Sequence, residues 1–500
     1  MSQFDIGSKL KELVNHSAVY GLGSVLQSAL GFVLIPLYTK NLTVEMYGAW
    51  SLITLAGTLA GVVFYLGASS ALSRSFYDYD DLAGRRKVVS TALLLTVVGA
   101  VLQIVIGWAC RRQISHFLFG SDQYALHIGL ALTSAAFVFI NGLFYVVLRF
   151  QRRSKAVVIV NLLTMLNGAG LIIYFLLIQR LGVLAPLLGE VINQVLTCLV
   201  LAYLSRDLLG WRFSAHEVRV QLAYGLPTVI IGLAYYLFAH GDRYFIKRFC
   251  DLSDVGIYSL GARLGMLIQV LLIMPFGQIW LPVRMELRNK TDAGPFYERI
   301  LTYYVIGGML FAIGLSLFAR EIVGLLARDP GYAEAYRAVP FVVCAHLLYG
   351  LIAFLDTGIV YARRSGYSAA LFIGALAVNW LLNLLLLPRL GFIGAGLSLV
   401  VSMAALVTGV YFVSNRLWKI PMETRRLATS ALIFVAVLFV GAQIAAPGLL
   451  VSICLKTGLL LTTFAAFYWL VLSRDEKTWL GNAGRQARLL LGKEPSPKTA

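Results

Sequence analysis

The stretch NLTVEMYGAWSL at residues 41–52 recurs in part as DLSDVGIYSL at residues 251–260. In both copies Asn or Asp is followed by leucine and a hydroxyl residue, and then, a few positions on, by glycine and a Ser-Leu pair. One match of this length arises by chance, so the rest of the chain decides whether it marks a duplication.

Three further pairs of short motifs keep the same order along the chain. They are Tyr20-Gly21-Leu22 with Tyr224-Gly225-Leu226, Arg152-Arg153-Ser154 with Arg363-Arg364-Ser365, and Arg180-Leu181-Gly182 with Arg389-Leu390-Gly391. Together with the first match they form one register, which predicts that the second half of the chain repeats the first.

The apolar content shows what is duplicated. Of 500 residues, 59% are apolar and 13% are charged, whereas soluble proteins carry about 25% charge and about 45–50% apolar residues. An apolar run of about 20 residues crosses a bilayer as a helix, and we count about 14 such runs. The sequence therefore predicts an all-α polytopic membrane protein. The spans are expected at about 14–39, 47–69, 88–109, 125–148, 157–178, 183–205, 222–240, 256–280, 300–319, 338–360, 368–387, 393–414, 428–446 and 450–472.

Each copy of the repeat contains six spans. Six is an even number, so both copies have the same orientation and are related by an axis along the membrane normal. We expect two pseudo-symmetric six-helix bundles followed by two C-terminal helices. The predicted boundaries are a cytoplasmic N-terminus at 1–13, an N-lobe at 14–205, a cytoplasmic linker at 206–221, a C-lobe at 222–414, the last two spans at 428–472 and a basic cytoplasmic tail at 473–500.

The net charge follows from this topology. Lys and Arg number 42 against 24 Asp and Glu, which gives +18. In a soluble protein this excess would suggest nucleic acid, but the spans leave no room for a nucleic-acid-binding module. Most basic residues fall in alternate loops, and the positive-inside rule then places both termini in the cytoplasm. The five cysteines are scattered without metal-ligand spacing, so no metal site is expected.

Several motifs together resemble a known family. They are the Asn/Asp-Leu-Thr/Ser turn after the first helix of each lobe, the run Asp242-Arg243-Tyr244, Asn379 to Asn383, Pro388-Arg389-Leu390-Gly391 and Gly394-Ala395-Gly396. They are similar to the polysaccharide-transporter branch of the multidrug/oligosaccharidyl-lipid/polysaccharide (MOP) exporter superfamily, which contains the Wzx-type O-antigen and exopolysaccharide flippases. The resemblance covers nearly the whole chain.

The resemblance implies a function. It implies a flippase, not an enzyme, in the inner membrane of a bacterium, which moves an undecaprenyl-diphosphate-linked oligosaccharide to the outer leaflet by alternating access. It needs no cofactor, although coupling to H+ or Na+ is expected. The expected partners are the lipid-linked oligosaccharide, membrane lipids, and the polymerase and glycosyltransferases of the same pathway, with no nucleic acid.

Arg263 is the main candidate for the substrate headgroup. A cation within a span costs about 2.5–3.5 kcal/mol on insertion scales, so it needs a reason to be there. Gly261 and Gly265 flank it in a GxxxG pattern, which allows one helix face to pack closely while the arginine points elsewhere. Family members carry arginines that face the cavity on corresponding helices. The alternative is a structural ion pair with Glu190 at similar depth.

Other polar residues are weaker candidates. Those assigned to the substrate cavity with Arg263 are Arg243, Gln27, Gln269, Tyr235, Asn379 and Asn383. Asn379 and Asn383 lie one helical turn apart and equally suit a helix–helix contact. The groups assigned to ion or proton coupling are Glu190, Asp356, Asp242 and His346, and Asp356 is expected to reach water or Arg363. Asp242 and Arg243 are expected at the outer end of the seventh helix.

Two other functions remain open. A multidrug exporter of the same superfamily would need acids in the N-lobe cavity, and Glu190 is the acid that we place inside an N-lobe span. A membrane polymerase or ligase would need a large outer loop, and no such loop is expected. No phosphate-binding loop motif indicates ATP hydrolysis.

Overall fold

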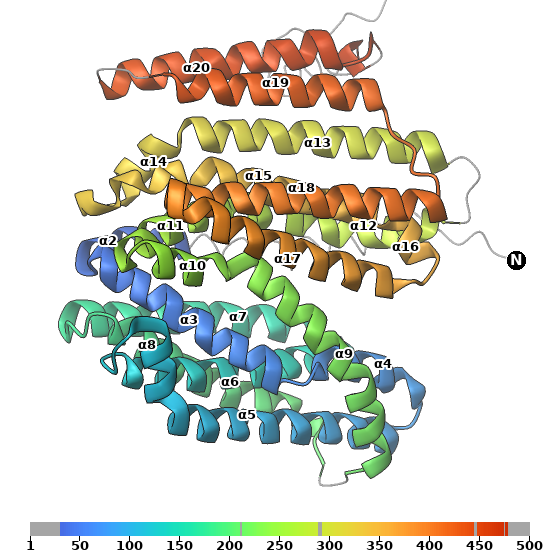
Figure 1. Ribbon diagram of the computed structural model, residues 1–500. Coiled ribbons are helices and arrows are strands. Elements are labelled where there is room, and N and C mark those ends of the chain that lie inside the picture. The colour runs from blue at the N-terminus through green and yellow to red at the C-terminus, as the bar shows by residue number, and fades with distance from the viewer. Residues whose placement is uncertain (1–30, 211–212, 289–292, 445–447, 475, 479–500) are drawn as a thin grey trace, which may run out of the picture.

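Helices dominate the part of the chain that the computed structural model describes, residues 31–210, 213–288, 293–444, 448–474 and 476–478 (Figure 1). These residues contain no strand. Thirteen helical segments in them are long and apolar enough to cross a membrane. Most of the first predicted span, 14–39, lies outside the described residues, and its end forms α2 (Ile35–Asn41). The prediction of an all-α polytopic membrane protein is confirmed.

The helices gather in two groups, one in the lower and one in the upper half of Figure 1. The N-lobe contains α2 and then α3 (Val44–Phe64), α4 (Ala68–Ser75), α5 (Leu82–Phe119), α6 (Ala125–Phe150), α7 (Ser154–Ile173) and α8 (Leu184–Ser205). The C-lobe contains α9 (Ala215–His240), α10 (Asp242–Phe249), α11 (Leu252–Gly265), α12 (Met274–Leu287), α13 (Ala293–Leu317), α14 (Ala319–Leu326), α15 (Val339–Leu355), α16 (Thr357–Tyr361), α17 (Ser365–Leu390) and α18 (Phe392–Leu417). Short 3-10 or π-helical turns are Phe76–Asp78, Tyr174–Ile178, Arg206–Leu208, Gln269–Ile273, Pro330–Arg337 and Phe467–Val471.

Two further features complete the arrangement. The last helices, α19 (Thr424–Ala442) and α20 (Leu449–Ala466), lie along α13 at one edge of the molecule (Figure 1). Helix α9 contacts both lobes, because it packs against α4 and α5 of the N-lobe and against α17 of the C-lobe. The lobes are thus connected by contact as well as by the chain.

The seventh span begins earlier than predicted and ends at His240, as predicted. Helix α9 begins at Ala215, inside the interval expected to be a linker, and the hydroxyl of Ser214 caps it by accepting the backbone N–H of Glu217 at 3.4 Å. After Gly241 the chain continues as α10 to Phe249. Of the charged residues that follow His240, Asp242 and Arg243 are buried.

The eighth span is also longer than the predicted 256–280. Helix α11 begins at Leu252, where the Asp251 carboxylate accepts the backbone N–H of Asp254 at 2.8 Å. A π-helical turn and α12 then carry the segment to Leu287. Arg284 lies inside this extension and is paired, so its charge does not end the helix.

The lobes touch where α3 and α11 begin. A Cβ added to Gly48 would collide with the backbone oxygen of Leu252, and a Cβ added to Gly256 would collide with that of Val44. The contact is reciprocal, as expected when equivalent segments of a repeat meet across a pseudo-twofold axis. Only glycine allows this approach of two backbones. We call it the Gly48–Gly256 contact.

A second contact joins the lobes at the other end of α3. Gly67 has a φ of 66°, a left-handed conformation that favours glycine, and a Cβ on Gly225 of α9 would collide with the backbone oxygen of Leu66. Nearby, the Tyr79 hydroxyl donates to Glu217 at 2.6 Å. The lobes are therefore in contact at both ends of α3.

An ion pair joins the last helix to the C-lobe. Lys456 of α20 lies 2.7 Å from the Glu321 carboxylate of α14, and the Ser452 hydroxyl donates to the same group at 2.6 Å. Burial raises the pKa of Glu321, but the hydrogen bonds from Lys456 and Ser452 outweigh this effect and hold the pKa below its ordinary value. A carboxyl group with a lowered pKa stabilises the fold above its unfolded pKa and loses this effect as the pH falls through its folded pKa.

We therefore expect the melting temperature of the purified protein to fall on acidification below about pH 4.3, the ordinary pKa of Glu, and to fall less in Glu321→Gln. Thermal unfolding followed at several pH values measures this difference. The control is Glu334→Gln, because the Glu334–Arg337 pair is about half exposed and such pairs contribute little. Equal acid sensitivity of Glu321→Gln and the wild type would contradict the assignment.

Candidate functional site

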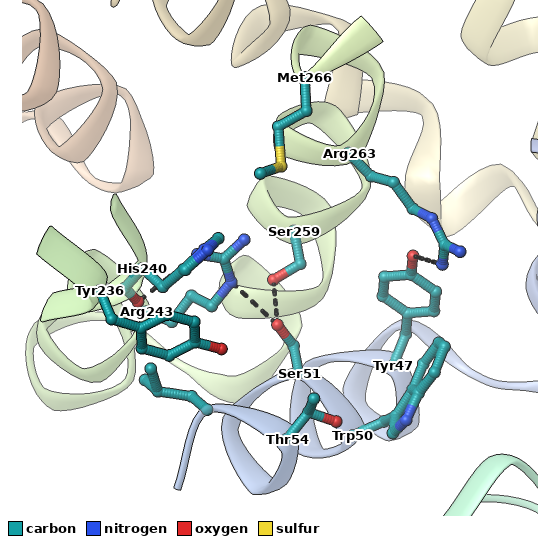
Figure 2. A pocket seen from close by; sticks show the side chains of 11 residues that line it. Tyr47, Trp50, Ser51, Thr54, Tyr236, His240, Arg243, Ser259, Arg263 and Met266 are labelled. Carbon is teal, nitrogen blue, oxygen red and sulfur yellow. Dashed lines mark hydrogen bonds between the residues drawn. The ribbon is translucent and has the colours of Figure 1, made fainter. Parts of the chain in front are cut away.

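A cavity of about 230 Å³ lies at the junction of the two lobes (Figure 2). Its walls come from α3 of the N-lobe and from α9, α10 and α11 of the C-lobe. The lining residues are Tyr47, Trp50, Ser51, Thr54, Leu55, Tyr236, His240, Arg243, Ser259, Arg263 and Met266. These described residues provide two arginines, hydroxyl groups and aromatic rings, and none of them carries a carboxylate.

Arg263 reaches from the C-lobe toward aromatic rings of the N-lobe. Its Nη1 donates to the Tyr47 hydroxyl at 3.3 Å (Figure 2), and its guanidinium carbon lies 5.7 Å from the ring centroid of Tyr38 and 6.0 Å from that of Trp50. Gly31, just before α2, is close as well, since a Cβ there would lie 3.3 Å from Nη2. The guanidinium is therefore held by π-systems and one hydroxyl.

The flanking glycines explain this orientation. A Cβ on Gly261 would collide with the backbone oxygen of Ala335, and one on Gly265 would lie 2.7 Å from Val342. That face of α11 packs closely against the segment leading into α15, so Arg263 is directed to the other side. This is the arrangement that the GxxxG spacing predicts.

Within the described residues, no carboxylate lies within 4.0 Å of the Arg263 guanidinium. The alternative partner, Glu190, instead accepts a hydrogen bond from Gln194 at 2.7 Å. Equal depth along two helices does not make two side chains face each other, and here they do not pair. Arg263 thus presents a positive charge at the cavity wall without a neutralising acid in the described part of the chain.

Arg243 bridges the lobes from α10, the short helix that follows the seventh span. Its Nε donates to the Ser51 hydroxyl of α3 at 3.0 Å, and Nη1 lies 3.2 Å from Oδ1 of Asp242 and 3.2 Å from Nδ1 of His240. Ser259 donates to the same Ser51 oxygen at 2.8 Å (Figure 2). Arg243 therefore lines the cavity together with Arg263, but it already has an acidic partner.

Asp242 is buried behind Arg243, with 1% of its surface exposed. One carboxylate oxygen accepts the backbone N–H of Arg243 at 2.9 Å, and the other accepts the hydroxyl of Tyr258. Asp242 and Arg243 lie directly after the end of α9 at His240, as expected, and they form the first residues of α10.

Asn379 and Asn383 lie away from the cavity lining. Asn379 donates to the Ser402 hydroxyl of α18 at 3.1 Å, and Asn383 donates to Asn379 at 3.0 Å. Both are essentially unexposed. The structure places them in the contact between α17 and α18, which corresponds to their alternative, structural interpretation.

Two coupling candidates of the C-lobe, Asp356 and His346, are not part of the main cavity's lining. Asp356 pairs with Arg284 of α12, whereas water or Arg363 was expected beside it, because α12 extends past the predicted end of its span. His346 and Tyr235 line a separate small cavity of about 20 Å³. His346 bonds through Nδ1 to the backbone oxygen of Val342 at 2.8 Å.

Two remaining candidates are easily placed. Gln269 begins the π-helical turn after α11 and is partly buried, but it is outside the cavity lining. Gln27 lies outside the described residues. The structure therefore brings together Arg263 and Arg243 and separates the other candidates from them.

Sequence reasoning missed several lining residues. Ser51 and Ser259 were visible only as matched residues of the repeat, and that match indicated equivalent positions in the two lobes. Tyr47 and Trp50 lie next to them on α3, where an aromatic residue near a span end is ordinarily read as an interfacial anchor. Tyr47 and Trp50 contact Arg263 because α11 lies close to α3.

Comparison with known proteins gives a family and a fold. The model of the family described as "Polysaccharide biosynthesis protein" matches residues 13–287. An Lsg locus protein of Haemophilus influenzae is 25% identical over 273 residues, which cover 51% of this chain and 61% of that protein. An uncharacterised membrane protein of the same organism is 21% identical over 277 residues, which cover 52% and 62%. The matched part thus spans less than two thirds of either relative.

Solved structures extend the likeness to most of the chain. A lipid II flippase, MurJ, in an inward closed conformation superposes with a TM-score of 0.72, at 14% identity, over 90% of this chain and 99% of that one. The MATE transporter VcmN of Vibrio cholerae gives 0.56, at 16% identity, over 83% and 98%. An outward-facing MATE family transporter of the MOP superfamily gives 0.57, at 13% identity, over 84% and 97%. At these identities the likeness establishes the fold.

Proposed function

The chain belongs to the polysaccharide biosynthesis protein family, and from this premise we propose that it flips an oligosaccharide linked to undecaprenyl diphosphate across a bacterial inner membrane. Its family and its fold are those of membrane transporters. In this proposal both termini are cytoplasmic, the saccharide moves outward by alternating access, and the product serves O-antigen or exopolysaccharide synthesis. The polymerase and glycosyltransferases of that pathway are its functional partners.

The observation that carries the proposal is Arg263. A guanidinium in a transmembrane cavity is costly to desolvate, and here no described acid neutralises it. A phosphoryl group supplies both the opposite charge and the oxygen pairs that match a guanidinium. The hydroxyl groups and rings of Ser51, Thr54, Trp50 and Tyr236 beside it suit a sugar attached to the phosphate.

The same cavity argues against export of cationic drugs. A cation would need a carboxylate among the groups that surround it, and the described lining contains arginines and no acid. The charge of Arg263, which has no acidic partner among the described residues, also repels a cation before any contact forms. An anionic headgroup therefore suits this cavity better than a drug cation.

A deletion strain tests the proposed function. Without the protein, surface polysaccharide should disappear while lipid-linked saccharide accumulates and remains inaccessible to a lectin added to spheroplasts. Expression of the wild-type chain should restore lectin access. Normal lectin access in the deletion strain would show that another protein moves the saccharide.

We also propose Glu190 as the site of ion coupling. Asp242 and Asp356 are each paired with an arginine, whereas Glu190 has no cationic partner within 4.0 Å among the described residues. It can therefore accept a proton or a sodium ion without breaking an ion pair. Glu190→Gln should flatten the dependence of transport on pH or sodium, measured as export rate across a series of buffers.

The control for this experiment is Glu45→Gln, which neutralises an exposed acid in the first turn of α3. It should leave the dependence as in the wild type. If Glu190→Gln kept the full pH and sodium dependence, coupling would have to be assigned elsewhere.

A further inference from the structure

The hydrogen bonds of Arg243 lie beside the closest approach of the two lobes. Ser51 and Ser259, which bond to each other, are three residues beyond Gly48 and Gly256 on their helices, or about one turn. Arg243 adds a charge-assisted bond from the C-lobe to the same Ser51 oxygen. The Gly48–Gly256 contact and this polar group therefore separate together when the lobes move apart.

The guanidinium of Arg243 has competing partners. Nε donates a hydrogen bond to Ser51, and Nη1 lies within hydrogen-bond distance of Asp242 and His240. Nη2 has no hydrogen-bond partner among the described residues. A phosphoryl group binds a guanidinium through two parallel N–H groups, and the two phosphoryl groups of a diphosphate together carry at least two negative charges, against one on a carboxylate. When a phosphoryl group binds Arg243 through Nε and an Nη nitrogen, the hydrogen bond from Nε to Ser51 breaks.

Asp242 has two hydrogen-bond donors besides the guanidinium of Arg243. Its Oδ1 keeps the backbone N–H of Arg243 at 2.9 Å, and its Oδ2 keeps the Tyr258 hydroxyl. The buried carboxylate thus retains two donors after the guanidinium swings away, which limits the cost of leaving it without its cation. Arg263 has no such acid, so it is free to hold an anion at all times.

We infer that Arg243 couples anion binding to separation of the lobes: a second phosphoryl group in the cavity draws its guanidinium from Ser51 and Asp242 and thereby releases the Gly48–Gly256 contact. This rests on the proposed function. One phosphoryl group is held by Arg263 and the other reaches Arg243, so a diphosphate releases the contact and a monophosphate does not. The cavity thereby distinguishes a lipid diphosphate from a lipid monophosphate.

Accessibility of the contact tests this coupling. Val44 is buried beside Gly256, so Val44→Cys, in a chain whose five native cysteines are replaced by serine, should react slowly with a charged maleimide. Geranylgeranyl diphosphate, added to the purified protein in detergent, should raise the labelling rate roughly tenfold, the order expected for loss of a charge-assisted hydrogen bond. Geranylgeranyl monophosphate should leave it unchanged.

Variants separate the coupling from binding. Ser51→Ala should label quickly without any ligand, whereas Arg243→Gln should bind the diphosphate through Arg263 and show no rise in labelling when it binds. The control, Thr96→Ala, removes a buried hydroxyl bonded within its own helix at 2.9 Å, and it should behave like the wild type.

A full rise in labelling in Arg243→Gln would overturn the coupling and leave the proposed function intact. Absence of diphosphate binding to the wild-type chain, measured by calorimetry, would overturn the proposed function and the coupling with it. A second isosteric variant guards against misfolding: Asp242→Asn should bind the diphosphate about three- to tenfold more tightly, because the acid that competes for Arg243 is removed. Weaker binding by Asp242→Asn would also overturn the coupling.

Discussion

Arg263→Ala is expected to reduce export of the surface polysaccharide at least about 100-fold, because losing a charge-assisted contact with a phosphate costs on the order of 3 kcal/mol. The protein should still accumulate normally in the membrane. Arg263 has no described ion pair, and the neighbours Tyr38, Tyr47 and Trp50 lose one hydrogen bond at most. Surface polysaccharide, quantified against protein level in a deletion strain, measures the effect.

Arg263→Lys should retain part of the export. Lysine keeps the positive charge but lacks the planar fork that binds two phosphate oxygens. The control is Arg320→Ala in α14, an exposed arginine outside the cavity, which should export normally. Normal export by Arg263→Ala would remove Arg263 from the substrate site.

The second large effect is expected at the Gly48–Gly256 contact. Gly256→Ala introduces a Cβ where the backbone oxygen of Val44 lies, and Gly48→Ala does the same against Leu252. A backbone atom cannot move away like a flexible side chain, so the helices must separate and the closed contact is lost. We expect each variant to lower the export rate by roughly tenfold or more, as a few kcal/mol of overlap would do.

Loss of helix stability does not explain reduced export by the two alanine variants. Alanine stabilises a helix by about 1 kcal/mol relative to glycine, so loss of export cannot be attributed to a weaker helix. The matched control is Gly142→Ala in α6, where an added Cβ meets no atom within 4 Å. Wild-type export by both Gly48→Ala and Gly256→Ala would show that the contact does not have to close.

The membrane spans and the two-lobe repeat were predictable from the sequence because they depend on length, composition and repetition. About 20 apolar residues predict a span wherever they occur, and the repeat predicted that residues 41–52 and 251–260 are equivalent. The repeat alone did not show that Gly48 and Gly256 touch. That follows from how closely the two lobes approach their common axis, which hydropathy does not record.

The error at the end of the eighth span concerns a charged residue. The span was ended at 280, before Arg284, and an isolated charge is costly in a bilayer. Arg284 has the carboxylate of Asp356 as its partner in space. The partner Asp356 is distant from Arg284 in sequence, so a window along the chain counts the cost of the charge and misses its compensation.

The candidate site was predicted only in part, because the sequence does not show which side chains meet in space. Arg263 was found because a lone cation in a long apolar run is conspicuous. Glu190 matched it in depth but faces Gln194, because depth along a helix does not fix the direction of a side chain. Asn379 and Asn383 have the composition of a cavity wall and of a helix contact alike, and only the position of Ser402 distinguishes these roles.

Transport by the purified protein tests the central proposal most directly. The full chain is reconstituted into vesicles that contain a fluorescent oligosaccharide linked to undecaprenyl diphosphate, and the label that reaches the outer leaflet is measured by quenching from outside. Wild-type protein should move the label well above the rate of protein-free vesicles, and Arg263→Ala should not exceed that rate. Equal movement by wild type and Arg263→Ala, or none by the wild type, would contradict the proposal.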